Sequence, residues 1–250
     1  MRYGARPEGL AEWLAFFSGK VPVPVLDTLV PLVQTRALLA AANRGVFAAL
    51  ADGPAEASVL AARCRIDAEC LRLVLRVLES MRYVERQGAC WALGMLGRHH
   101  FGKGSSERCD AFLGYGPAQW GFIGQLDGVL ERGTGIDFHA HQTPDEWRAY
   151  QAAMLEMARA FAPFVVRKTP VPGGATSCLD VAGSHGLVGG LLCMRHPGMR
   201  CTVVDRGEAL TSARQLGVGE PWYGHVSFRE GDLLRGSLGE GEHDVVLLCN

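Results

Sequence analysis

The sequence lacks an excess of charge of either sign. Its 250 residues include 25 lysines and arginines and 26 aspartates and glutamates, which gives a formal net charge of -1 at pH 7. This balance provides no general attraction to nucleic acid or to an anionic membrane surface. A small neutral or mixed-charge ligand therefore suits the chain better.

Cysteine pairs at metal-ligand spacing are also missing. None of the eight cysteines belongs to a C-x-x-C pair, and several stand within apolar runs, where a thiol acts as a small core side chain. The nearest resemblance to a metal site is His139 with His141, but no acidic or cysteine partner stands at ligand spacing nearby. We therefore predict reduced thiols, no metal site and two solvated loop histidines.

A signal-peptide core is not present near the beginning of the sequence. The apolar run at residues 13–17 is too short for such a core or for a membrane span. We therefore expect a cytoplasmic protein. With 48% hydrophobic residues, the chain can bury a substantial core.

The first third of the chain has the pattern of a winged helix-turn-helix domain. Amphipathic periodicity predicts three helices, and two short β-prone runs separated by a glycine-containing turn predict a hairpin after them. The helices are expected at residues 34–50, at 57–64 and, after a cap at Asp67, along the stripe of Leu71, Val74, Leu75 and Leu78; the hairpin strands are expected at 83–85 and 90–93.

DNA binding is the usual role of that fold, but the charges of residues 67–86 cancel. Four acids stand against four arginines there: Asp67, Glu69, Glu79 and Glu85 against Arg72, Arg76, Arg82 and Arg86. Because phosphate contacts dominate protein–DNA affinity, a neutral recognition helix disfavours DNA binding. A packing and dimerisation module is the preferred interpretation.

The middle of the chain is predicted to be helical. Residues 94–135 have weak periodicity, which indicates irregular structure or short helices. A better defined helix begins at Thr143, where the sequence Thr-Pro-Asp-Glu is typical of a capping box. Its Trp147, Tyr150 and Met154 are candidates to line a substrate pocket, although side chains at helical spacing are more often simple core. Prolines and glycines at residues 170–174 mark a linker.

The last third alternates strands and helices. Strands are expected at residues 177–181, 201–204, 226–228 and 244–248, and a helix at 187–195 follows a tight small-residue turn. Asp205 lies 25 residues after Asp180 (205 − 180), where an open α/β sheet needs an acid to bind ribose hydroxyls. The pattern predicts a parallel sheet with a ligand at the carboxyl ends of its strands.

The turn after residue 181 does not have the G-x-G-x-x-G pattern of dinucleotide-binding proteins. Instead, Asp180-Val-Ala-Gly-Ser-His-Gly186 resembles the acidic-x-G-x-G-x-G loop of class I S-adenosylmethionine-dependent methyltransferases, with Ala182 and Ser184 in place of two glycines. Both residues are small, but neither tolerates positive φ as freely as glycine does. The order of winged helix, helical middle and this loop resembles the O-methyltransferases of plant phenolics and bacterial polyketides.

That resemblance implies a Rossmann-like methyltransferase domain behind an all-α winged helix-turn-helix domain, with S-adenosylmethionine as cofactor. Asp205 would hold the ribose hydroxyls, residues 231–233 would flank the adenine, and Gly183 would lie against the methionine end. Asp180 would act through the amino group of the cofactor or through the backbone of the loop. His185 is given no chemistry, because a solvent-facing side chain suits it equally well. The cofactor-binding residues implied are Asp180, Gly183, Ser184, Gly186, Asp205, Arg206, Gly231, Asp232 and Leu233.

The resemblance also bears on the catalytic base. In the family, this base is a histidine a few residues beyond the strand that corresponds to residues 244–248, and the sequence ends at Asn250. We therefore expect a parallel sheet that is incomplete and a chain that lacks the base, so the catalytic residues are left unknown. The expected division is a dimerisation domain at 1–100, a substrate-lining region at 101–169 and a cofactor domain at 170–250.

Other functions remain open at the level of sequence. Relatives with this fold include enzymes of C- or N-methylation, decarboxylation or hydroxylation, and a winged-helix regulator that senses the cofactor is a further alternative. Arg206 beside Asp205 suggests an NADP oxidoreductase, which the missing phosphate loop disfavours. The resemblance implies a homodimer, to which the apolar residues 26–33 would contribute, and a small hydroxylated substrate.

Overall fold

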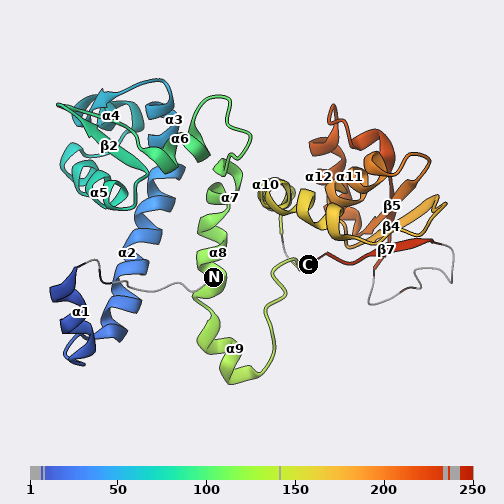
Figure 1. The fold of residues 1–250 in the computed structure, drawn as a ribbon, viewed down its shortest axis with the longest axis horizontal. Helices are drawn as coiled ribbons and strands as arrows, with labels where there is room; N and C mark the ends of the chain where they lie inside the picture. Colours follow the sequence, from blue (N-terminus) through green and yellow to red (C-terminus); the bar gives the residue numbers. More distant parts are fainter. Residues whose placement is uncertain (1–6, 8, 141, 233–235, 237–242, 250) are drawn as a thin grey trace. The chain divides into compact units, whose positions relative to one another are not determined.

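The structure, a computed structural model, describes residues 7, 9–140, 142–232, 236 and 243–249. The chain forms two compact units that divide between Ser105 and Ser106 (Figure 1). The expected three-part division at residues 100 and 169 stays a prediction.

The first unit contains helices and a small antiparallel sheet. In chain order its elements are α1 (Leu10–Phe17), α2 (Val23–Asn43), α3 (Val46–Ala51), β1 (Ala55–Glu56), α4 (Ala57–Cys64), α5 (Ala68–Ser80), β2 (Val84–Gln87), β3 (Cys90–Leu93) and α6 (Met95–Phe101). The strands are arranged in the order β1-β3-β2, so β3 pairs with both neighbours. The predicted order of helices followed by a hairpin is confirmed, while the sheet means that this unit is not all-α.

The expected single helix over residues 34–50 is wrong in one respect. The structure has two helices there, because Gly45 adopts the left-handed conformation, with φ 76°, and separates α2 from α3. Glycine enters this region without the steric cost of a Cβ. The break allows Phe47 of α3 to stack on Phe101 of α6, with ring centroids 4.1 Å apart. The expected cap at Asp67 is confirmed, since its Oδ1 accepts hydrogen bonds from the N–H groups of Glu69 and Cys70.

The second unit begins with short helices and ends with a sheet. Its elements are α7 (Asp110–Gly114), α8 (Gly116–Ile123), α9 (Leu126–Arg132), α10 (Pro144–Lys168), β4 (Ser177–Val181), α11 (Leu187–Arg195), β5 (Arg200–Asp205), α12 (Gly207–Gly217), the 3-10 turn η1 (Tyr223–His225), β6 (Val226–Glu230) and β7 (Val245–Leu247). The capping box of α10 is present: the side chain of Thr143 accepts from the N–H of Glu146, and Glu146 accepts from the N–H of Thr143. The predicted start of α10 is therefore confirmed.

Within the described residues of the second unit, four strands form a parallel sheet in the order β6-β5-β4-β7. In this register Asp180 of β4 lies opposite Val203 of β5 and Leu247 of β7. The carboxyl ends of the strands therefore lie at one edge of the sheet. Helix α10 packs against α11 and α12, and α11 packs against β5, so that the core of the unit lies between the helices and the sheet (Figure 1).

Candidate cofactor site

The loop after β4 has an unusual backbone. Ala182 and Ser184 adopt positive φ angles of 52° and 53°, and Gly186 has φ 80°. The left-handed conformation costs roughly 1–2 kcal/mol in a residue that has a Cβ. The loop is held by hydrogen bonds from the N–H of Ala182 to the carbonyl of Val204 and from the N–H of Gly186 to the carbonyl of Gly183, both 2.8 Å long. The substitutes for glycine thus adopt the backbone conformation that glycine would favour.

Asp180 lies buried beneath this loop. Its Oδ2 accepts from the N–H of Gly189 at 3.3 Å, whereas Oδ1 has no partner among the described residues. Burial, and secondarily the charge of Asp205, raises the pKa of the Asp180 carboxyl to about 7. A Cβ at Gly183 would lie 2.5 Å from Cγ of Asp180, so the loop can approach the carboxyl only with glycine there. Asp180 is therefore bonded to the first turn of α11 and lies against the loop at Gly183.

Asp205 stands at the end of β5 and joins the loop. Its Oδ2 accepts from the N–H of Ser184 at 2.9 Å, and its Oδ1 accepts from the N–H of Arg206 at 2.8 Å. Each carboxylate oxygen can accept more than one hydrogen bond, so capacity remains for two neighbouring hydroxyls. The sequence spacing correctly predicted that Asp205 and the loop lie together.

The end of β6 extends the same edge of the sheet. The N–H of Gly231 donates to the carbonyl of Asp205 at 2.9 Å, and a Cβ at Gly231 would lie 2.8 Å from Cγ1 of Val204. Asp232 follows as an exposed residue. Leu233, the third residue expected against the adenine, lies outside the described residues. Gly231 is therefore joined to the loop region through Asp205.

Two side chains near the loop were not assigned from the sequence. His185 is buried rather than solvent-facing: its Nδ1 accepts from the N–H of Leu187 at 3.1 Å, and its ring lies near the backbone of Met154. Burial lowers the pKa of His185 to about 4, so the ring is neutral at pH 7. Gln151 of α10 is also buried, and its Oε1 accepts from Oγ of Ser184. A lone glutamine in a helical stripe carries no sequence signal for such a contact.

The candidate substrate-lining residues of α10 belong to an aromatic cluster. The ring of His139 stacks on Trp147, with centroids 4.6 Å apart and planes inclined by 9°, and it meets the ring of Tyr150 edge-on at 4.8 Å. The ring centroid of Phe138 lies 4.2 Å from that of His139. The expectation that His139 is solvated is wrong, since its ring is half-buried in this cluster. His141 lies outside the described residues, and no group of potential metal ligands occurs within the described ranges.

The aromatic cluster adjoins the acid at the end of β5. The guanidinium of Arg206 lies 5.9 Å from the ring centroid of Trp147, which is the geometry of a cation–π contact. Burial, followed by the nearby charge of Asp205, raises the pKa of the Tyr150 phenol. Met154, the third candidate, is half-buried one turn further along α10. The loop, Asp205 and the aromatic cluster thus form one continuous region of the second unit.

These features define a Rossmann-like fold of the methyltransferase type, preceded by a helical unit. No family model matches the sequence, and no curated protein matches it. The comparison with known proteins therefore rests on solved structures of similar fold. PigF with SAH has a TM-score of 0.76 and 19% identity over 90% of this chain and 70% of that chain.

Two further solved structures have the same fold. Human N-acetylserotonin methyltransferase in complex with SAM has a TM-score of 0.71 and 21% identity, over 95% of this chain and 70% of that chain. The mitomycin 7-O-methyltransferase MmcR has a TM-score of 0.71 and 22% identity, over 90% of this chain and 68% of that chain. At such identities the comparison establishes a common fold, and the chain spans about two thirds of the length of these proteins.

Proposed function

We propose that the chain binds S-adenosylmethionine and takes part in methyl transfer to a hydroxyl group of a small molecule. The observation that carries this proposal is the contact between the left-handed loop after β4 and Asp205: the N–H of Ser184 donates to the carboxylate at the end of the next strand. The residues that would hold the cofactor are Asp180, Gly183, Ser184, Gly186, Asp205, Arg206, Gly231 and Asp232, with Leu233 beyond the described residues.

The charges of the region fit this cofactor. S-adenosylmethionine carries a sulfonium and an amino group, both positive, and the carboxylate of Asp205 lies at the loop, above the buried carboxyl of Asp180. Oδ1 of Asp180 has no partner among the described residues, so a hydrogen bond is still available there. The Asp205 carboxylate would repel the pyrophosphate of NADP, and Arg206 lies over Trp147. This arrangement favours the sulfonium cofactor.

The acceptor would lie against the aromatic cluster. When bound, S-adenosylmethionine supplies an electrophilic methyl group, so the task left to the protein is to bring the acceptor oxygen into line with it. The partly exposed rings of Tyr150 and His139, the latter stacked on the buried Trp147, offer apolar surface near Asp205 for a planar acceptor. The similar proteins named for 7-O-methylation of mitomycin and for methylation of N-acetylserotonin support an acceptor of this kind.

Methyl transfer from radiolabelled cofactor to a panel of phenols tests the activity. Label in an extracted phenol product, lost in Asp205→Ala, supports the proposal and contradicts the expectation that the chain lacks its catalytic base. Label found only on carbon or nitrogen acceptors would mean that the chain transfers the methyl group to those atoms and not to oxygen. Salt-sensitive retardation of DNA would instead favour a winged-helix regulator, because such binding depends on phosphate contacts.

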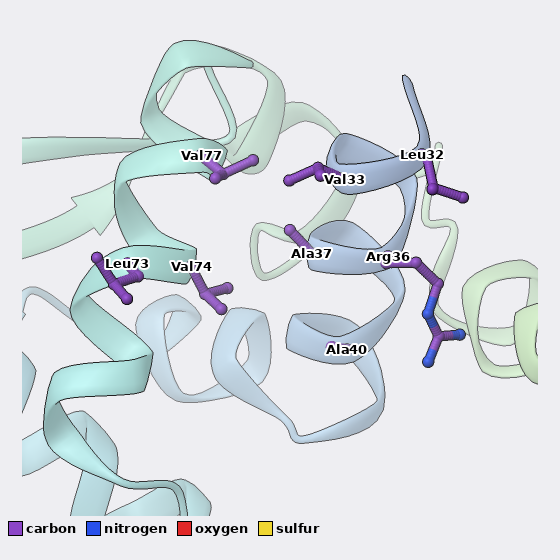
Figure 2. Close-up of a pocket in the computed structure, with 8 residues that line it drawn as sticks. All are labelled: Leu32, Val33, Arg36, Ala37, Ala40, Leu73, Val74 and Val77. Atoms are coloured by element: carbon purple, nitrogen blue, oxygen red, sulfur yellow. The ribbon is translucent and has the colours of Figure 1, made fainter. Parts of the chain in front are cut away.

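We further propose that the first unit is a winged-helix module that joins two copies of the chain in the cytoplasm. Val25, Leu29 and Val33 of α2 are 46–55% exposed, although all three are apolar. Figure 2 shows Val33 and Ala37 of α2 facing α5 across a hollow of about 530 Å³. A second copy would remove this surface from water. Helix α2 also has the length and composition to span a membrane, so lipid binding is the competing outcome.

A further inference from the structure

We propose that Gln151 is a positioning residue for the cofactor loop. It compensates for the serine that stands at position 184 where the resembled loop has glycine. The inference rests on the proposed function in one respect, which is that S-adenosylmethionine is the ligand of the loop. Its physical basis lies in the contacts of Ser184 and Gln151.

Ser184 has a backbone conformation that its surroundings must impose. Its φ of 53° lies in the left-handed region, which disfavours side chains with a Cβ. Such residues persist where several contacts determine their conformation together. Ser184 has two: its N–H donates to Oδ2 of Asp205 at 2.9 Å, and its Oγ donates to Oε1 of Gln151. Glycine at position 184 would need only the hydrogen bond to Asp205, because glycine adopts positive φ without cost.

Gln151 is suited to hold the loop because it has no contact with bulk water. Its side chain is 1% exposed, and Trp147, Ala153 and Leu155 of the same helix are buried too. Leaving a buried amide without its hydrogen-bond partner costs about 1–3 kcal/mol of free energy. The folded protein therefore strongly favours the bond between Gln151 and Ser184. Gln151 can therefore keep Oγ of Ser184, and with it the backbone, in one position.

Helix α10 contacts two consecutive residues of the loop. Gln151 binds Ser184, and the backbone of Met154, less than one helical turn away, lies close enough to the ring of His185 to affect its pKa. Tyr150 lies in the aromatic cluster on the same helix. The loop is thus fixed from outside the sheet by the helix that also presents the proposed acceptor surface. Cofactor affinity should depend on this helix even though Gln151 itself need not touch the ligand.

Substitutions at position 184 separate this role from general packing. Ser184→Ala keeps the strained backbone and removes Oγ, whereas Ser184→Gly removes both the strain and Oγ. Isothermal titration with S-adenosylhomocysteine should give about tenfold weaker binding for Ser184→Ala and Gln151→Leu, equivalent to one lost hydrogen bond. The affinity of Ser184→Gly for S-adenosylhomocysteine should stay within about threefold of that of the original protein. Adding Gln151→Leu to Ser184→Gly should change this affinity by less than about threefold. Gln215→Leu, at an exposed site on α12, is the matched control.

The result that would overturn the inference is an equal loss of affinity from Gln151→Leu in the serine and glycine backgrounds, or no loss in either. Hydrogen exchange of the free protein provides a readout that needs no ligand. Amides of residues 182–187 should exchange faster in Ser184→Ala and in Gln151→Leu than in the original protein. They should not exchange faster in the double variant Ser184→Gly with Gln151→Leu than in Ser184→Gly alone. If the unsubstituted chain fails to bind S-adenosylhomocysteine, the proposed function fails, and unchanged exchange in Ser184→Ala would separately refute the role of Gln151.

Discussion

Ala182 shows most simply how a single residue carries strain in the loop. Its φ of 52° is a conformation that disfavours a Cβ, and its N–H is bonded to the carbonyl of Val204 at 2.8 Å, which fixes the backbone there. Unlike Ser184, alanine has no polar side-chain atom that could offset the cost. Substitution of Ala182 by glycine should therefore relieve the strain at this position.

We predict that Ala182→Gly raises the free energy of unfolding by about 0.5–1 kcal/mol, because relief of positive φ exceeds the added backbone entropy of glycine. The same change at Ala160, an exposed position within α10, should lower it by about 1 kcal/mol. Urea unfolding measures both. A loss of stability in Ala182→Gly as large as in Ala160→Gly would mean that the loop is not strained.

Two buried titratable residues give opposite dependences of stability on pH. The pKa of Asp180 is raised to about 7 by burial and by Asp205, so the folded protein keeps a proton that the unfolded chain has lost, and stability falls as pH rises from about 4 to about 7. The pKa of His185 is lowered to about 4 by burial, so the unfolded chain binds the proton, and stability rises from about pH 4 to about 6.5. The two contributions oppose each other over the range they share.

Removing either group should reveal the contribution of the other. Between about pH 4 and 6.5, His185→Asn should become less stable as pH rises, and Asp180→Asn more stable, each with a slope approaching about 1 kcal/mol per pH unit. The unsubstituted protein should change less than either. Urea unfolding at several pH values measures the slopes, and the same sign of slope in both variants would refute the assignment.

The sequence predicted part of the site and missed part of it. Asp205 and the loop could be placed together because the carboxyl ends of neighbouring parallel strands lie at one edge of a sheet. Gln151 could not be found in this way, because its partner Ser184 is 33 residues away on another element. His185 and His139 are polar residues that looked exposed, and only tertiary packing decides that their rings are covered.

At the scale of elements, α11 approaches β5 and the segment before η1 through its glycines. A Cβ at Gly189 would lie 2.4 Å from Sγ of Cys201 on β5, and one at Gly190 would lie 2.9 Å from Cβ of Trp222. The helix can therefore come this close only where side chains are absent. The sequence predicted α11 and β4 with their observed ends, but it did not show which glycines serve as contacts.

We predict that Gly189→Ala lowers the free energy of unfolding by at least about 2 kcal/mol, because the added methyl overlaps a buried sulfur. Cys201→Ala removes that sulfur and should restore part of the loss in the double variant. Gly121→Ala, within α8 and with no atom within 4 Å of the new Cβ, should be neutral or stabilising. Thermal or urea unfolding compares the set. Strictly additive effects of Gly189→Ala and Cys201→Ala would contradict the overlap.

Elements in the first unit illustrate a limit of periodicity. Residues 34–50 have continuous helical spacing, yet Gly45 divides them, because an isolated glycine is compatible both with a helix interior and with a left-handed end. In contrast, the beginning of α10 was predictable, since a capping box depends on local sequence alone.

At the scale of the whole molecule, the exposed face of α2 bears on assembly. Leu32 and Val33 are 47% and 46% exposed and adjoin the hollow beside α5. We predict a dimer in sedimentation velocity and a shift toward monomer in Leu32→Glu, because a buried unpaired charge opposes association. Leu10→Glu, on α1 and also exposed, is the control that should remain dimeric. A monomer before substitution, or flotation with lipid vesicles that Leu32→Glu abolishes, would contradict the proposed dimer.

Binding of S-adenosylhomocysteine by isothermal titration tests the proposed cofactor site most directly. We predict one site per chain with a Kd of about 10 μM or below, and at least about tenfold weaker binding in Asp205→Ala, since the ribose hydroxyls would lose a charged acceptor. NADPH should give no heat of binding under the same conditions. The absence of binding by S-adenosylhomocysteine, or tight binding of NADPH alone, would contradict the assignment of this loop to a methyltransferase cofactor.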